Sequence, residues 1–159
     1  MFKLNEVDMS IEQIEQRIKQ WNDRCGNVPC DKRDTLDDVV RKVLPQANVI
    51  LEEAKELVAA LEDKDETEIK DGVADVLFTS LRLVSLIGDK YDLFDILNKV
   101  CDNNDKKYTT IERDFVYDDK WFVPDTFDVV TVIDGVMYYC LKNENGKVVK
   151  PKNFPKVEL

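Results

Sequence analysis

The chain has 159 residues, a length that suits one domain with a real hydrophobic core, with or without an appended subdomain. Its formal net charge of −10 argues against a nonspecific nucleic-acid binder, because such a protein needs a basic surface to displace counterions from phosphates. The absence of histidine excludes Ser-His and Cys-His nucleophile pairs, and leaves carboxylates, lysine, tyrosine or a metal-bound hydroxide as general base.

The four cysteines predict free thiols in a reducing compartment. Only Cys25 and Cys30 are close in sequence, and without a second Cys or His pair they do not make a zinc motif. No segment resembles a transmembrane run, and the first ten residues lack a signal-peptide pattern. We therefore expect a soluble, cytoplasmic protein without a membrane or nucleic-acid partner.

The first two-thirds of the chain predict helices. Capping boxes at Ser10 and Thr35 open two of them, each with apolar residues at helical spacing behind it. Pro45 then breaks or kinks the second helix, or serves as the first residue of the next. We expect the helices of the bundle near residues 11–25, 46–62, 67–87 and 90–101.

Beyond Lys107 the apolar period changes. The runs VVTVI and VMYYCL flank the turn dipeptide Asp134-Gly135, which predicts a β-hairpin over 127–142, followed by a loop-like tail. The sequence thus predicts an all-α protein, a four- to five-helix bundle with a small C-terminal β-hairpin excursion. We assign residues 1–107 to a helical domain, and 108–159 to a hairpin and tail packed on it.

Two clusters of carboxylates stand beside apolar helix faces. The first acidic row is Glu52, Glu53 and Glu56, in which Glu53 and Glu56 project together from the edge of a buried face. The second acidic row is Glu68, Asp71 and Asp75, which follow one another by about one turn along one side of the next helix.

Each row has an ordinary interpretation as well as a functional one. A glutamate cluster on a helix is usually a solvated face, and Asp75 could pair with a buried arginine or lysine. Asp75 is nevertheless surrounded by apolar residues in VADVLF, where an unpaired carboxylate is costly. Two such rows on successive helices favour an oxygen-rich site for Mg²⁺ or Mn²⁺.

These acidic rows resemble the motifs of the MazG-like all-α nucleoside triphosphate pyrophosphohydrolase superfamily, an E-E-x-x-E helix followed by an E-x-x-D helix. The form EIKDGVADVLFT is most similar to phage and bacterial members related to phosphoribosyl-ATP pyrophosphohydrolase. Asn104-x-x-Lys107 and the segment GKVVKP near the C-terminus match further motifs. Gly72 departs from the pattern, since many members carry Glu three residues before the last Asp, and whether Glu68 or Asp71 is the fourth ligand stays open.

The resemblance implies Mg²⁺-dependent hydrolysis of a (deoxy)nucleoside triphosphate to the monophosphate and pyrophosphate, with Mn²⁺ as a possible substitute. Membership of the phage type would place the protein in the host cytoplasm. The implied metal ligands are Glu53, Glu56, Asp71 and Asp75. The residues implied to activate the water or complete the metal site are Glu53, Glu52 and Glu68. The residues implied to bind the substrate are Trp21, Asn22, Asn104, Lys107, Lys147 and Lys150.

Ordinary interpretations also apply to the substrate-binding residues, because Trp21 suits a core position and the lysines suit a solvated surface. Two other function classes stay open: a noncatalytic nucleotide or metal binder, and a helical interaction protein whose acidic rows meet a basic partner. Because the helix over 67–87 is apolar almost all round, we expect a homodimer or a dimer of dimers.

Overall fold

The structure is a computed structural model that describes residues 10–117, 119, 121–152 and 154–156. Most of the amino-terminal stretch considered for a signal peptide, and part of the predicted tail, lie outside these residues. The chain divides into two compact units, Met1–Asp92 and Leu93–Leu159. The domain boundary at residue 107 stays a prediction from the sequence.

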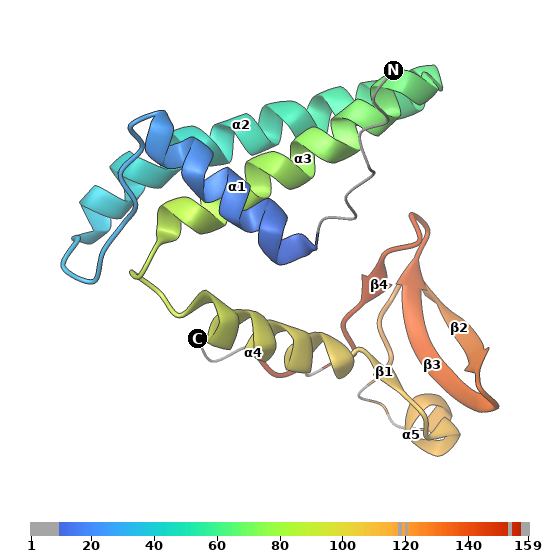
Figure 1. The fold of residues 1–159 in the computed structure, drawn as a ribbon. Coiled ribbons are helices and arrows are strands. Elements are labelled where there is room, and N and C mark those ends of the chain that lie inside the picture. Colours follow the sequence, from blue (N-terminus) through green and yellow to red (C-terminus); the bar gives the residue numbers. More distant parts are fainter. Residues whose placement is uncertain (1–9, 118, 120, 153, 157–159) are drawn as a thin grey trace. The chain divides into compact units, whose positions relative to one another are not determined.

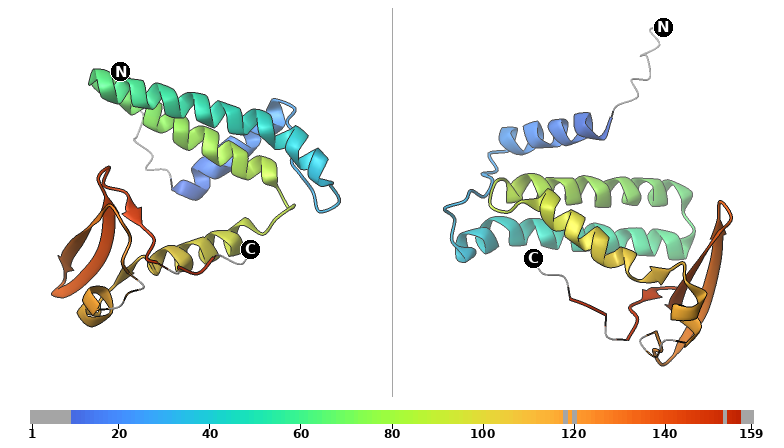
Figure 2. Two further views of the ribbon diagram at one scale, coloured as in Figure 1. Left: turned by 180° about the vertical axis from the view of Figure 1, so that it is seen from behind. Right: turned by 90° about the horizontal axis from the view of Figure 1, so that it is seen from below.

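The first unit is built from three helices, α1 (Ile11–Arg24), α2 (Leu36–Asp63) and α3 (Glu66–Ile87). The long helices α2 and α3 run antiparallel and lie side by side, and α1 packs against α3 (Figures 1 and 2). Only Lys64 and Asp65 separate α2 from α3, and Lys64 adopts a left-handed conformation with a φ of 58°. This tight connection makes α2 and α3 a helical hairpin.

The predicted capping boxes at Ser10 and Thr35 are confirmed. The Gln13 N–H donates to Ser10 Oγ at 3.4 Å, and the Ser10 N–H donates to Gln13 Oε1 at 2.9 Å. At α2 the Asp38 N–H donates to Thr35 Oγ1 at 3.2 Å, and the Thr35 N–H to Asp38 Oδ2 at 3.1 Å. Each box satisfies amide groups that have no partner in the first helical turn, and so fixes where its helix begins.

Pro45 does not divide the second helix, because α2 is continuous over 28 residues with the proline inside it. The predicted start at residue 46 is therefore wrong. Proline costs one backbone hydrogen bond and crowds the preceding turn. The packing of α2 along α3 supplies enough contact to keep the helix in one piece, as tertiary packing stabilises most helices in proteins.

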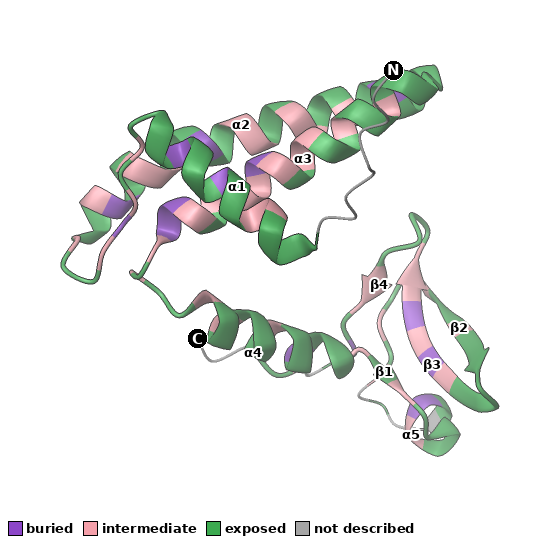
Figure 3. Cartoon of the chain, in the orientation of Figure 1, coloured by how far each residue is buried: buried purple, intermediate pink, exposed green. Residues whose placement is uncertain are grey.

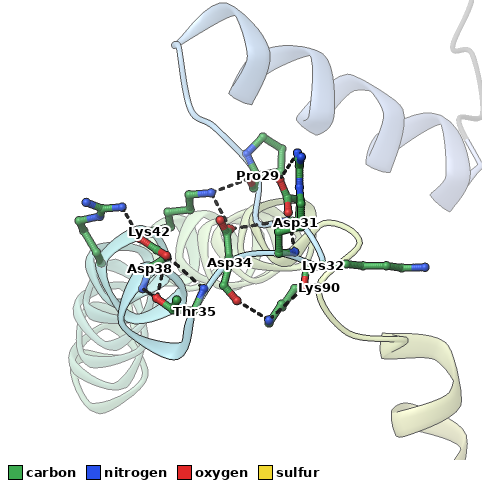
Figure 4. A network of polar contacts seen from close by, with 10 residues as sticks. Pro29, Asp31, Lys32, Asp34, Thr35, Asp38, Lys42 and Lys90 are labelled. Atoms are coloured by element: carbon green, nitrogen blue, oxygen red, sulfur yellow. Dashed lines mark hydrogen bonds and ion pairs between the residues drawn. The ribbon is translucent and has the colours of Figure 1, made fainter.

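A polar network holds the connection between α1 and α2 against the end of α3 (Figure 4). Lys42 Nζ donates to Asp34 Oδ2 at 2.6 Å and to the Pro29 carbonyl at 3.1 Å, while Lys90 donates to the Asp34 carbonyl. The Lys42 hydrogen bond holds the pKa of Asp34 below its usual range, and the Asp34 carboxylate raises the pKa of Lys42. The Cys30 N–H adds a bond to the Leu86 carbonyl at 2.7 Å.

The second unit combines two helices with a small antiparallel sheet. Strand β3 is hydrogen-bonded to each of the other three strands, so it forms the centre of the sheet. The elements are α4 (Leu93–Asp105), β1 (Tyr108–Thr109), α5 (Glu112–Tyr117), β2 (Thr126–Ile133), β3 (Val136–Asn143) and β4 (Val148–Val149).

The predicted hairpin is confirmed as β2 and β3. Asp134 and Gly135 have φ values of 49° and 78°, the two left-handed residues that a tight hairpin turn requires. Sequence reasoning missed β1, α5 and β4, and the tail is not all loop, since β4 pairs with β3. Phe115 of α5 forms a small core with Tyr139 and Leu141 of β3.

The predicted fold class is confirmed: the chain is mostly helical, with five helices and a small C-terminal antiparallel sheet among the described residues. Helix α4 begins at Leu93, three residues later than expected, and extends to Asp105. All four cysteines are free thiols. None of the helices in the described part of the chain is long and apolar enough to cross a membrane.

Candidate active site

The two acidic rows lie on the paired helices α2 and α3, and a glycine sets how closely these helices approach. A Cβ atom added to Gly72 would lie only 3.2 Å from both the Cα and the Cβ of Leu57. Even a Cβ atom there would require Leu57 to move by a few tenths of an ångström, and a larger side chain would require more. The residue that departs from the family motif therefore faces α2, and it brings the second acidic row next to the first.

Glu53 lies at the centre of the carboxylates. It is half-buried, and its pKa is raised, first by its partial burial and then by the negative charges of Asp75, Glu56, Glu52 and Asp71. The acids that perturb Glu53 come from both helices, which places the two acidic rows within electrostatic reach of each other. Carboxylates gathered in this way repel one another unless a cation or a proton joins them.

The acidic rows fit a hard divalent cation in composition. Among residues 10–117 and the other described positions, no three Asp, Glu or Cys side chains are close enough together to hold one ion as they stand. Mg²⁺, however, usually keeps several waters and takes only one or two carboxylates together with substrate phosphates. Glu52, Glu56, Glu68 and Asp71 are exposed, and Asp75 is half-buried, so most of these side chains can rotate toward an ion.

Trp21 and Asn22, the predicted base-binding residues, are both joined to Arg82 of α3. The Arg82 guanidinium carbon stands 4.3 Å from the centre of the Trp21 ring, and Trp21 remains 40% exposed. Asn22 is buried, and its Oδ1 accepts from Arg82 Nε at 3.4 Å and from Asn27 Nδ2 at 3.0 Å. These bonds allow Asn22 to orient Arg82 and Asn27.

The other predicted substrate-binding residues belong to the second compact unit. Asn104 is exposed at the end of α4, and its carbonyl accepts from the half-buried Lys107 N–H at 2.9 Å. Lys147 and Lys150 are exposed on either side of β4. The Lys150 ammonium lies 5.1 Å from the centre of the Phe154 ring. All three lysines keep an ammonium group able to meet a phosphate.

Comparison with known families decides the classification. The model of the MazG nucleotide pyrophosphohydrolase domain matches residues 35–114, half of the chain. The chain belongs to this family. No curated protein and no solved structure matches the chain.

The matched region of this MazG domain runs from the cap of α2 into α5. It contains both acidic rows as well as Asn104 and Lys107, so the resemblance noted from the sequence is confirmed at the level of the family. Trp21, Asn22, Lys147 and Lys150 lie outside the matched residues. The chain therefore carries a nucleotide pyrophosphohydrolase domain, which is a hydrolase by general activity.

Sequence reasoning missed two residues that shape the region around the acidic rows of the MazG domain. One is Gly72, whose role depends on the facing Leu57 and is invisible without the pairing of the helices. The other is Arg82, for which a signal existed: it is the first charged residue after Asp75 in an otherwise apolar and neutral run. A lone cation in such a run is costly to bury, so it marks a position with a specific partner.

Proposed function

We propose that this MazG protein hydrolyses a (deoxy)nucleoside triphosphate to the nucleoside monophosphate and pyrophosphate in the presence of Mg²⁺. The observation that carries the proposal is the half-buried Glu53, whose pKa is raised by carboxylates from both α2 and α3. Such a concentration of charge favours the binding of a cation. The family model supports the class of reaction.

Each acidic residue has a proposed role. Glu53, Glu56, Asp71 and Asp75 would hold Mg²⁺ or Mn²⁺, and Asp71 is favoured over Glu68 as the fourth ligand because it is among the charges that raise the pKa of Glu53. When bound, the metal offsets phosphate charge and lowers the pKa of a coordinated water. Glu52 or Glu68 would complete the metal site or accept the proton of the attacking water.

Each predicted substrate residue also has a proposed role. Lys107, Lys147 and Lys150 would supply positive charge for the phosphates in a protein whose net charge is −10. Asn104 belongs to the same Asn-x-x-Lys motif as Lys107 and would act on the substrate beside it. Trp21 stacks with Arg82 and remains 40% exposed, so it would contribute to base binding together with Arg82, and Asn22 would contribute through the side chains that it orients.

The experiment that tests the proposal is a panel of common ribo- and deoxyribonucleoside triphosphates with Mg²⁺, in which pyrophosphate and orthophosphate are measured separately. We expect pyrophosphate without orthophosphate from at least one substrate. Release of orthophosphate alone would mean cleavage at the outer phosphate and would contradict the proposal. Triphosphate binding without any product would instead favour the noncatalytic nucleotide binder.

Metal binding has a signature in stability. We expect Mg²⁺ or Mn²⁺ at ten times its dissociation constant to stabilise the fold by about 1.4 kcal/mol, which is a rise of about 3–6 °C in melting temperature. Glu56→Gln should remove most of this shift, while the exposed Glu62→Gln should keep it. A melting temperature that neither ion changes would count against the metal site and would favour an interaction protein.

The oligomeric state is part of the same proposal. Helix α2 exposes apolar side chains that repeat at heptad spacing, with Leu44, Leu51 and Val58 at exposed fractions of 53%, 54% and 52% (Figure 3). Helix α3 adds Val73 and Leu77, which are 54% and 51% exposed. A heptad seam of this kind suits a second pair of helices, so we propose a homodimer, or a dimer of dimers.

Light scattering tests the assembly. We expect at least a dimer at micromolar concentration, and we expect Leu51→Lys to shift the population toward monomer because it places a charge on the apolar seam. Gln20→Lys, at an exposed position on α1 instead of α2, is the matched control and should leave the mass unchanged. A monomeric wild-type protein would exclude the assembly.

A further inference from the structure

A cleft of about 340 Å³ opens at one end of the α2–α3 hairpin, within the first compact unit. Its walls come from the connection after α1 and from the facing sides of α2 and α3. This volume falls in the range of about 300–1,000 Å³ that is typical of small-molecule sites. The residues that matter for the argument are Asn27, Lys42, Gln46, Val49, Arg82 and Leu86, which combine apolar walls with a few polar groups.

Arg82 is the unusual group in this cleft. Its guanidinium is half-buried and stacked on Trp21, and burial lowers its pKa. Nε donates to Asn22, and no carboxylate among the described residues forms an ion pair with Arg82. No buried side-chain nitrogen among the described residues lacks a hydrogen-bond partner, so the remaining N–H groups of Arg82 are accessible and can donate to an acceptor on a ligand.

Gln46 supplies the complementary group. The side chain is buried on α2, and its Nε2 donates to the Thr79 carbonyl at 2.9 Å. This bond fixes the direction of the amide and leaves Oε1 as the atom that can accept from a ligand. Lys42 also lines the cleft, but its ammonium is already bonded to Asp34 and to the Pro29 carbonyl. The cleft therefore offers Arg82 as donor and Gln46 as acceptor.

The cleft lies at a fixed spacing from the acidic rows. Gln46 precedes Glu53 by seven residues on α2, and Arg82 follows Asp75 by seven residues on the antiparallel α3. Seven residues are about two helical turns, or about 10.5 Å along the helix. Both pairs share a helix face, so a nucleotide with its base in the cleft can extend its phosphates along the hairpin toward the acidic rows.

We propose that this cleft receives the nucleobase, and that Arg82 is the specificity-determining residue that selects bases with a carbonyl oxygen. The inference rests on the proposed function, because it assigns the base end of the same substrate. The guanidinium fork has only donors, and a carbonyl oxygen accepts two of them in its plane. Adenine has no carbonyl oxygen and turns an amino group toward the cation. Asn22 is a positioning residue that holds Arg82 in the cleft.

The kinetic test compares Arg82→Met with wild type on dUTP, dGTP and dATP. In wild type we expect dATP to be the poorest substrate. The variant should lower kcat/KM about ten- to hundredfold for dUTP and dGTP and less than about threefold for dATP, because only the carbonyl bases lose their partner. Arg82→Lys keeps the charge without the fork and should be intermediate. The exposed Arg24→Met is the control and should change none of the three.

An equal loss on all three substrates would show that Arg82 only supports the fold and would overturn the inference. The Mg²⁺-dependent rise in melting temperature provides a check, since Arg82→Met should retain it. If Arg82→Met has lost this rise, Arg82→Lys replaces it as the test variant. The ratio of its kcat/KM on dUTP to its kcat/KM on dATP, compared with the wild-type ratio, then decides whether Arg82 selects the base.

A binding test separates this inference from the proposed function. In a Trp121→Phe background, Trp21 is the single tryptophan and reports directly on the Arg82 side chain above it. Inosine and adenosine differ only at one edge of the base. Inosine has a carbonyl group and a ring N–H there, whereas adenosine has an amino group and a ring nitrogen without hydrogen. We expect inosine to quench Trp21 fluorescence with about tenfold higher affinity, without metal or turnover.

Each outcome of the binding test has one meaning. Stronger binding of inosine supports the cleft even if no triphosphate is hydrolysed, in which case only the proposed function fails. Equal binding, tighter binding of adenosine or no quenching by either nucleoside overturns the cleft, even if the protein releases pyrophosphate.

Discussion

Asp75→Asn should abolish triphosphate hydrolysis and leave the fold intact. Asparagine has nearly the same shape and volume as aspartate, but it removes the charge from the second acidic row. A metal that stabilises transition-state charge contributes several kcal/mol, so we expect kcat/KM to fall by about a thousandfold or more. Pyrophosphate release under saturating Mg²⁺ measures the loss, and circular dichroism measures the fold.

The metal-free protein gives this variant a second readout. Asp75 is the first of the charges that raise the pKa of Glu53, so its neutralisation relieves repulsion and should hold or raise the melting temperature without Mg²⁺. Asp63→Asn, at the exposed end of α2, is the control and should keep full activity. Full activity of Asp75→Asn would show that the second acidic row is wrongly assigned.

Gly72→Leu should damage both the stability and the activity of the protein. Even a Cβ atom at this position would meet the Leu57 backbone at 3.2 Å, and a leucine must push α3 away from α2. Overpacking typically costs about 1–3 kcal/mol, which lowers the melting temperature by about 2–12 °C in a chain of this size. A displacement of about 1 Å between catalytic groups can reduce activity by about a hundredfold.

The effects on stability and on metal binding should appear together in Gly72→Leu, because one displacement causes both. Differential scanning fluorimetry with and without Mg²⁺ measures the two in a single experiment. Ala59→Leu adds a similar side chain on an exposed position of α2 and should change neither. A Gly72→Leu protein with a normal melting temperature and a full Mg²⁺ shift would mean that this contact does not set the spacing of the acidic rows.

The parts of the fold that local chemistry determines could be predicted from the sequence. The capping boxes at Ser10 and Thr35, the end of α3 at Ile87 and the turn at Asp134-Gly135 each involve residues within a few positions of one another. Pro45 misled the prediction because its local cost is outweighed by contacts along α3. Strand β4 was missed for a related reason, since two residues become a strand only where β3 is available to pair with them.

The same distinction applies to the candidate site. Glu53, Glu56 and Asp75 could be singled out because helical spacing and apolar neighbours are properties of one helix at a time. The roles of Gly72 and Arg82 depend on what faces them, Leu57 on α2 and Trp21 on α1 respectively. The periodicity of one helix does not show which residues of another helix it will face, so the roles of Gly72 and Arg82 emerged only from the structure.

The tight connection at Lys64 and Asp65 has a consequence for how the protein folds. Both acidic rows fall within residues 52–75, so their contacts join positions that are close along the chain. Closing a short loop costs little entropy, and local contacts of this kind form early in folding. The carboxylates therefore meet as soon as the α2–α3 hairpin forms, and their mutual repulsion opposes that step. We expect a divalent cation present during folding to speed the formation of this hairpin. The acidic rows would then influence the folding rate as well as the activity of the folded protein.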